Sequence, residues 1–378
     1  MQHSRAGIRR RTQSEPTPAP KGSGRTPLQI ADHNLRVTLE AIRRDGPLTR
    51  LELGRRSGLT APGITNILRR LSGDGLITAS KRREGGSGQP SMEFALNPDG
   101  AFAIGLRPRG ERSEAVLIDL SGRLRDAITF DATSKPITAI ADAVARLRGS
   151  VAPRAVVGIG IGAEVPAALD LQALSQALSP LPVLAERDCV TAVLAERTLG
   201  IGGEGGLMLV VIGDNIRAGL LLQGAPFGGV HGRAGGIGAM RTGTDHVPLD
   251  TVAGLGALRA QLTEEECATL ASGRDLPLTP AVQRWVKSAA GHLLDAIVAT
   301  AGFLAPSAIL IGGDLPRNVV EALIAQMSIE RTDTAIRPVL TPWLSPMQPT
   351  SFSGAGIAIG AALLPLFEQL LPSPMATA

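Results

Sequence analysis

The chain has 378 residues, and 44% of them are hydrophobic, so it can build a sizeable core and is expected to form two or three domains. Its two cysteines, Cys189 and Cys267, are too few for a disulfide framework or a multi-cysteine zinc site and predict a cytoplasmic location. No apolar run is long enough to span a membrane, and the N-terminus lacks the apolar core of a signal peptide.

The charge is unevenly distributed. Residues 1–100 hold 17 Lys and Arg against 9 Asp and Glu, whereas the remainder holds 21 against 25. The N-terminal part is therefore suited to a polyanion. Aromatic residues are few and tyrosine is absent, which argues against single-stranded nucleic acid held by base stacking.

The chain begins with a segment that should not fold by itself. Residues 1–26 are rich in Arg, Pro, Ser and Thr and predict a disordered basic arm. From Pro27 to Arg44, apolar residues at helical spacing, with Leu35, Leu39 and Ile42 among them, predict a first amphipathic helix.

Residues 45–83 carry the pattern of a DNA-reading unit. Thr49 and Glu52 form a capping box that starts a short helix, Gly58 ends it, and Thr60 with Pro62 opens a second helix. The buried stripe of this second helix is predicted to consist of Ile64, Ile67, Leu68 and Leu71. A strand from Leu76 to Thr78 then leads into the basic run Lys81–Arg83 and a glycine-rich turn.

Together these features predict a winged helix-turn-helix over residues 27–98, with double-stranded DNA as the partner. The residues expected to contact DNA are Thr60, Ala61, Thr65, Asn66, Arg69, Arg70, Lys81, Arg82, Arg83 and Gln89. The alternative is a small helical hairpin with ordinary solvated arginines.

Residues 99–378 alternate between strands and helices. Two sets of strands, each followed by helices, predict an α/β fold of two similar lobes. The expected strands are 101–106, 115–120, 124–131, 155–161, 207–212, 216–222 and 308–311, and the expected helices are 137–147, 189–199, 280–304, 319–327 and 355–371.

The segments ERDCVTAVLAERTLG, VVIGDNIRAGLLLQG, GGVHGRAGGIGAM, ILIGGDLP and GAGIAIGAALL, in this order behind a winged helix, resemble the ROK family (repressors, open reading frames and kinases). The resemblance implies a winged helix ahead of a two-lobed sugar-kinase fold related to hexokinase and actin. It also implies a relation to the family's xylose and N-acetylglucosamine repressors.

Several positions depart from the kinase members of that family. Arg107 stands where they carry an Asp that handles Mg²⁺ and phosphate, and Asn215 and Arg217 replace glycines of their phosphate-binding turn. Gly236 and Ala239 replace the Glu that holds sugar hydroxyls and the His that binds zinc. The sequence therefore predicts no metal, no cofactor and no enzymatic activity.

Two residues remain as candidates for a ligand, Asp188 and His231. Asp188 matches the family's catalytic base, but Arg187 replaces the neighbouring Asn. A carboxylate beside an arginine is typical of an ion pair or a helix cap.

We therefore interpret the chain as a DNA-binding transcription regulator, a repressor of carbohydrate-related genes. It would bind a palindromic operator as a homodimer or a higher homo-oligomer and respond to a sugar or sugar derivative. Two alternatives stay open: an ATP-dependent sugar kinase, and a constitutive DNA-binding protein without an effector.

Overall fold

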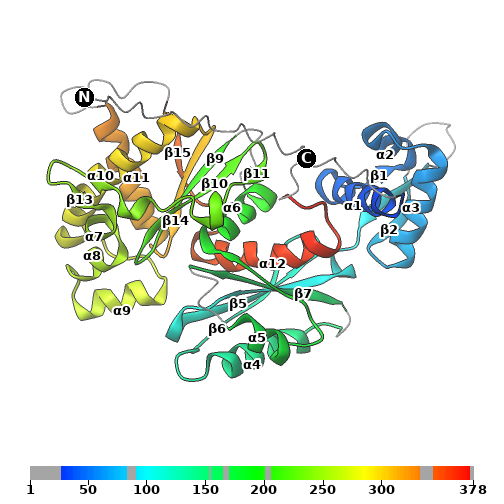
Figure 1. Ribbon diagram of the computed structural model, residues 1–378, viewed down its shortest axis with the longest axis horizontal. Coiled ribbons are helices and arrows are strands. Elements are labelled where there is room, and N and C mark those ends of the chain that lie inside the picture. The colour runs from blue at the N-terminus through cyan, green and yellow to red at the C-terminus, as the bar shows by residue number, and fades with distance from the viewer. Residues whose placement is uncertain are drawn as a thin grey trace, which may run out of the picture.

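The structure is a computed structural model, and it describes residues 27–82, 91–152, 155–164, 170–200, 206–332 and 344–374. The arm expected at residues 1–26 lies outside these ranges. Figure 1 shows a small unit at one end of the molecule and two larger lobes, with helix α12 between the lobes. We call residues 27–96 the winged unit.

The winged unit contains three helices and a three-stranded antiparallel sheet in the order β1-β3-β2. Both expected caps are present: the Thr49–Glu52 box begins α2, and Gly58, in the left-handed region at φ 67°, ends it. The elements are α1 (Pro27–Asp45), β1 (Leu48–Thr49), α2 (Arg50–Ser57), α3 (Ala61–Gly73), β2 (Ile77–Arg82) and β3 (Ser91–Leu96).

The first lobe is a five-stranded sheet in the order β6-β5-β4-β7-β8, with α4 and α5 on one side. Gly105 in β4 and Gly160 in β7 have a specific role, because a Cβ at either position would collide with the backbone of α12. The elements are β4 (Phe102–Arg107), β5 (Ser113–Asp119), β6 (Leu124–Phe130), α4 (Pro136–Gly149), β7 (Val156–Ala163), α5 (Leu171–Ala177) and β8 (Val183–Arg187).

The second lobe repeats this strand order as β11-β10-β9-β14-β15, which confirms the expected pair of similar lobes. Its core surrounds the long helix α10, whose Trp285 is 1% exposed. The strands are β9 (Leu207–Ile212), β10 (Ile216–Leu222), β11 (Ala225–Pro226), β14 (Ala308–Gly313) and β15 (Met347–Pro349), with a small pair β12 (Arg241–Thr242) and β13 (Val247–Pro248). The helices are α7 (Leu249–Ala253), α8 (Leu255–Arg259), α9 (Glu264–Ser272), α10 (Pro280–Leu304) and α11 (Arg317–Thr332).

Two helices, α6 (Asp188–Leu199) and α12 (Gly356–Gln369), connect these parts. They cross so closely that a Cβ at Gly360 would collide with the backbone of Thr191. One hydrophobic cluster runs from α1, through Leu35 and Leu39, to the C-terminal residues Leu366 and Leu371. The winged unit therefore packs against the C-terminal end of α12, where Arg36 of α1 donates to the carbonyls of Phe367 and Glu368 (Figure 1).

The long expected elements are present with ends within a few residues of those predicted. The sequence patterns did not predict α5, β8, β15 or the helices α7 to α9. These elements are short, and a helix of five to nine residues offers too few turns for its apolar period to be recognised.

Candidate nucleic-acid interface and ligand cleft

Helix α3 presents a polar face to solvent opposite its buried stripe. Ile64, Leu68 and Leu71 are buried, and Ile67 packs against the same core. Of the six α3-region residues expected to contact DNA, Thr65 is half-buried and the others are exposed: Thr60, Ala61, Asn66, Arg69 and Arg70.

Local hydrogen bonds order this face. Thr60 is the N-cap and accepts a hydrogen bond from the Gly63 amide. The Thr65 hydroxyl donates to the carbonyl of Ala61 at 2.8 Å, and Arg69 donates to the Asn66 amide oxygen at 3.1 Å. The Asn66 amide nitrogen has no such partner among the described residues, so it can donate to a ligand.

The wing is described in part. β2 and β3 pair from Ile77–Leu96 to Arg82–Ser91, and Lys81 is exposed on β2. The Arg82 backbone belongs to β2. Arg83 and Gln89 lie outside the described residues, as does the glycine-rich turn.

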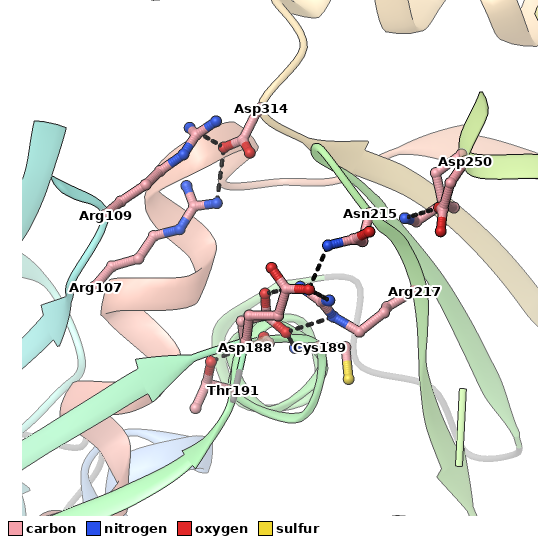
Figure 2. Close-up of polar contacts among 11 residues, drawn as sticks. Arg107, Arg109, Asp188, Cys189, Thr191, Asn215, Arg217, Asp250 and Asp314 are labelled. Carbon is pink, nitrogen blue, oxygen red and sulfur yellow. Dashed lines mark hydrogen bonds and ion pairs between the residues drawn. The ribbon is translucent and has the colours of Figure 1, made fainter. Parts of the chain in front are cut away.

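Asp188 and Arg217 form a buried pair where α6 begins (Figure 2). Arg217 on β10 donates to both carboxylate oxygens of Asp188, with Nε–Oδ1 at 3.0 Å and Nη2–Oδ2 at 2.5 Å. A third nitrogen of Arg217 lies 2.5 Å from Glu164 at the end of β7. Arg187, the neighbour expected to matter, instead donates to the Gly232 carbonyl.

The surroundings of Arg217 favour its charged form. Burial by itself would lower the pKa of Arg217, but hydrogen bonds and charge attraction from Asp188 and Glu164 raise it overall. Both oxygens of Asp188 are engaged by a permanent cation. Asp188 is therefore poorly placed to take a proton from a sugar hydroxyl.

A second set of ion pairs joins the two lobes. Arg107 and Arg109, at the end of β4, both contact the same oxygen of Asp314 after β14, at 2.8 and 2.7 Å (Figure 2). Asn215 also crosses between the lobes and donates to Glu164 at 2.6 Å.

These residues line two neighbouring spaces between the lobes. A cleft of about 510 Å³ is bounded by Arg107, Arg109, Asp314 and the start of α11. A smaller cavity of about 120 Å³ contains Asp188, Arg217 and Asn215, and shares the two arginines with the cleft. Four residues from distant parts of the sequence meet in this cavity: Arg107, Asp188, Asn215 and Arg217.

Glu164 and Asp314 were missed as partners. The position of Asp314 directly after the glycine pair that ends β14 weakly indicated a site residue. Glu164 follows β7 in the same way, at the corresponding edge of the first lobe. The carboxyl ends of parallel strands are the usual place for a ligand in such sheets.

The residues do not fit the magnesium–nucleotide site of a kinase. Guanidinium groups of Arg107 and Arg217 stand at positions where the resemblance would require a metal-binding carboxylate and a bare glycine. No group of three His, Cys, Asp or Glu side chains in the described part of the chain could hold a metal ion. Gly236 faces open space, and the His231 side chain lies outside the described atoms.

Comparisons with known proteins agree with this architecture. Residues 32–78 match a model described as "Winged helix-turn-helix DNA-binding". An uncharacterized protein, y4fQ from Sinorhizobium fredii, is 27% identical over 375 residues, covering 91% of this chain and 93% of that protein.

Solved structures share the fold across most of the chain. A ROK family transcriptional regulator described as a homolog of the E. coli MLC protein superposes with a TM-score of 0.69 at 21% identity, covering 92% of this chain and 98% of its own. A ROK family glucokinase from Streptomyces griseus, in complex with glucose and AMPPNP, superposes with a TM-score of 0.57 at 20% identity. The match covers 70% of this chain and 99% of the glucokinase.

No helix in the described ranges is both long and apolar enough to cross a bilayer. The match over residues 32–78 and the superposition over nine-tenths of the chain account for the winged unit and for both lobes. The chain carries a winged helix-turn-helix DNA-binding domain joined to a sugar-kinase-like domain, and the two together have the fold of a ROK family regulator.

Proposed function

We propose that this protein is a transcription regulator that represses carbohydrate-related genes from the cytoplasm. The observation that carries the proposal is the exposed polar face of α3, on a unit whose sequence matches DNA-binding winged helices. In this proposal residues 27–98 bind DNA, and residues 99–378 form a dimerising domain that senses a sugar or sugar derivative.

The proposed mechanism follows from the geometry of the winged unit. A homodimer would place two copies of α3 in successive major grooves of a palindromic operator, and Lys81 and its neighbours at the DNA backbone. An effector in the cleft would act by binding one dimer geometry better than another.

The kinase-like domain is proposed to be catalytically inactive. Phosphoryl transfer needs positioned phosphates, a metal and a base. Here Arg217 engages both oxygens of Asp188, and Arg107 brings a positive charge to the end of β4. The contacts of Arg217 support the loss of Asp188 as a base. The charge of Arg107 supports the loss of the metal site.

The first test is selection of bound sequences from random duplex DNA by the full chain. We expect enrichment of an inverted repeat, with half-sites about one helical turn apart. Light scattering on the purified protein then checks for the dimer that such a repeat requires. Failure to enrich any sequence would contradict the proposal.

A sugar kinase remains the second candidate, because Asp188 is retained and the fold is shared with a glucokinase. Sugar-dependent ATP consumption, measured with Mg²⁺ across hexoses and amino sugars, separates the two. We expect turnover equal to that of an Asp188→Ala control, and turnover clearly above the control would establish the kinase.

A further inference from the structure

A short connection leads from the winged unit into the first lobe, and it is held from both sides. It contains Asn97 and the turn η1 (Pro98–Gly100). Asn97 binds the winged unit twice: its backbone amide donates to the Leu76 carbonyl at 2.9 Å, and its side chain donates to the Gly75 carbonyl at 2.7 Å. On the other side, the Leu120 amide of the first lobe donates to the carbonyl of the first residue of η1, at 3.1 Å. The connection is therefore not a free hinge.

A second contact, far from this connection along the chain, joins α1 to the C-terminal end of α12. Nη1 of Arg36 donates to the carbonyls of Phe367 and Glu368, at 3.0 and 2.8 Å. Nε of Arg36 donates to Asp32 at 2.9 Å, which orients the guanidinium. Leu35, on the same helix, is buried in the hydrophobic cluster that includes this end of α12. A rotation of the winged unit would break these hydrogen bonds and expose apolar surface to water.

A third contact joins the C-terminal half of α1 to the first lobe and to α6. The Arg43 side chain is 8% exposed and pairs with both carboxylate oxygens of Glu40, at 2.6 and 2.7 Å. It also reaches the Ser121 carbonyl, between β5 and β6, at 3.5 Å. Arg197 of α6 lies within electrostatic range of Glu40: burial lowers the pKa of the Arg197 guanidinium, and the Glu40 charge opposes this change. Moving α1 away from α6 would remove that compensating charge.

We call the contacts of α1 with α12, α6 and the first lobe the junction. The junction bears on how an operator can be read. If a homodimer binds an inverted repeat, one base pair inserted between the half-sites displaces the second half-site by about 3.4 Å and turns it by about 35° around the DNA axis. A winged unit on a free tether could follow this change. A winged unit that is held at three places can follow it only by breaking contacts.

We propose, on the basis of the DNA-binding function proposed above, that Arg36 and Arg43 are positioning residues that fix the half-site spacing accepted by the protein. Helix α3 determines which bases are read, and the junction determines how far apart the two copies of α3 lie. Both arginines are on α1, against the rest of the molecule, and act through the placement of α3. Specificity for the operator is thus divided between two parts of the chain.

The test is fluorescence anisotropy of the full chain with three duplexes: the selected inverted repeat, the same repeat with one base pair inserted at its centre, and a single half-site. For the unaltered protein we expect the insertion to weaken binding by about tenfold or more, because the two half-sites can no longer be engaged together. Arg36→Ala/Arg43→Ala should reduce this discrimination to about threefold or less, while affinity for the single half-site changes by less than about twofold.

The matched control is Arg146→Ala/Arg284→Ala, which removes two exposed arginines, on α4 and α10, and leaves the junction intact. It should discriminate between the duplexes like the unaltered protein. Arg36→Lys is a milder variant that keeps the charge but loses the planar guanidinium, and it should give intermediate discrimination. If the double alanine variant does not bind the half-site, Arg36→Lys decides the question in its place.

Discrimination that is the same in the junction variants and in the unaltered protein would overturn the proposal. So would an unaltered protein that binds the lengthened repeat as tightly as the selected one. Either result would leave the DNA-binding function standing. Failure to select any repeat would instead contradict the DNA-binding function, and the role of the junction with it.

Discussion

Asn66 and Arg70 lie on the exposed face of α3 and contribute nothing to the buried stripe. Arg70 is 3.9 Å from Asp74 in the next turn, at a distance and exposure where an ion pair stabilises little. Their substitution should therefore affect DNA binding and leave folding intact.

Asn66→Ala or Arg70→Ala is expected to weaken binding to the selected site by about 1–3 kcal/mol, because each removes a donor that can reach a base edge. Fluorescence anisotropy at one fixed salt concentration measures the loss, with Arg146→Ala as the control. Unchanged affinity in both variants would show that α3 is not the recognition helix.

The Asp188–Arg217 pair makes a prediction about stability. Arg217→Ala leaves a carboxylate that is 5% exposed without its bidentate partner, so we expect the free energy of unfolding to fall by about 3–5 kcal/mol. Urea denaturation followed by tryptophan fluorescence measures it. The double variant Asp188→Ala/Arg217→Ala should recover part of the loss, and a double variant no more stable than Arg217→Ala would show that the unpaired buried carboxylate is not the cause.

The raised pKa of Glu114 predicts that the stability of the protein depends on pH. Burial is the main cause of its raised pKa, so the stability associated with its neutral form is fully present below the unfolded value of 4.5 and is lost as pH rises through the folded value. Glu114→Gln stays neutral throughout. The difference in Tm, variant minus unaltered protein, should therefore grow as pH rises from 4.5 towards neutrality, whereas a constant difference would contradict the assignment.

At the scale of elements, α12 links the cleft to the winged unit. Gly354, two residues before α12 begins, forms part of the cleft lining. The C-terminal end of α12 lies next to α1 (Figure 1). There Arg36 of α1 donates to the carbonyls of Phe367, Glu368 and Leu371, at 3.0, 2.8 and 3.4 Å. Helix ends leave carbonyls without partners, and Arg36 supplies the donors from another unit.

Arg36→Ala is expected to destabilise this junction by about 1–2 kcal/mol, because it leaves partly buried carbonyls without a donor. Hydrogen exchange should become faster in α1 and in the last turn of α12, while α10 stays protected. Equal acceleration in α10 would mean that the substitution destabilises the whole molecule and not the junction.

At the scale of the whole molecule, the charge is segregated. The first 100 residues carry a formal excess of 8 positive charges, and the remainder carries an excess of 4 negative charges. DNA should therefore bind at the winged end of the molecule and be repelled by the lobes, which would orient the encounter.

Replacement of Lys81, Arg82 and Arg83 by Gln should weaken binding to every duplex by a similar factor and reduce the salt slope of the binding constant by up to about 3. Binding titrations over a series of salt concentrations measure both effects. A loss confined to the selected sequence, with an unchanged slope, would instead assign the wing to base reading.

Much of the architecture could be predicted from the sequence because it depends on short-range patterns. Two examples are the Thr49–Glu52 capping box and the apolar stripe from Ile64 to Leu71, which each lie within a few residues of chain. The strands and helices of both lobes were likewise predicted one by one from local patterns. Helix caps and apolar periods act through neighbours three or four residues apart, so the order of residues already contains them. The uneven charge, and with it the suitability for DNA, is likewise a property of the order of residues.

The contacts within the cleft and at the winged unit were decided by the tertiary structure. Arg107 and Asp314 come from different lobes, Glu164 reaches Arg217 from the end of another sheet, and Arg36 lies 331 residues from Phe367. Such pairs depend on strand order, on the crossing of α6 and α12, and on glycines that let them approach. The sequence shows that these charges exist, but which of them meet is determined only when the two sheets and the two crossing helices have closed distant parts of the chain onto one another.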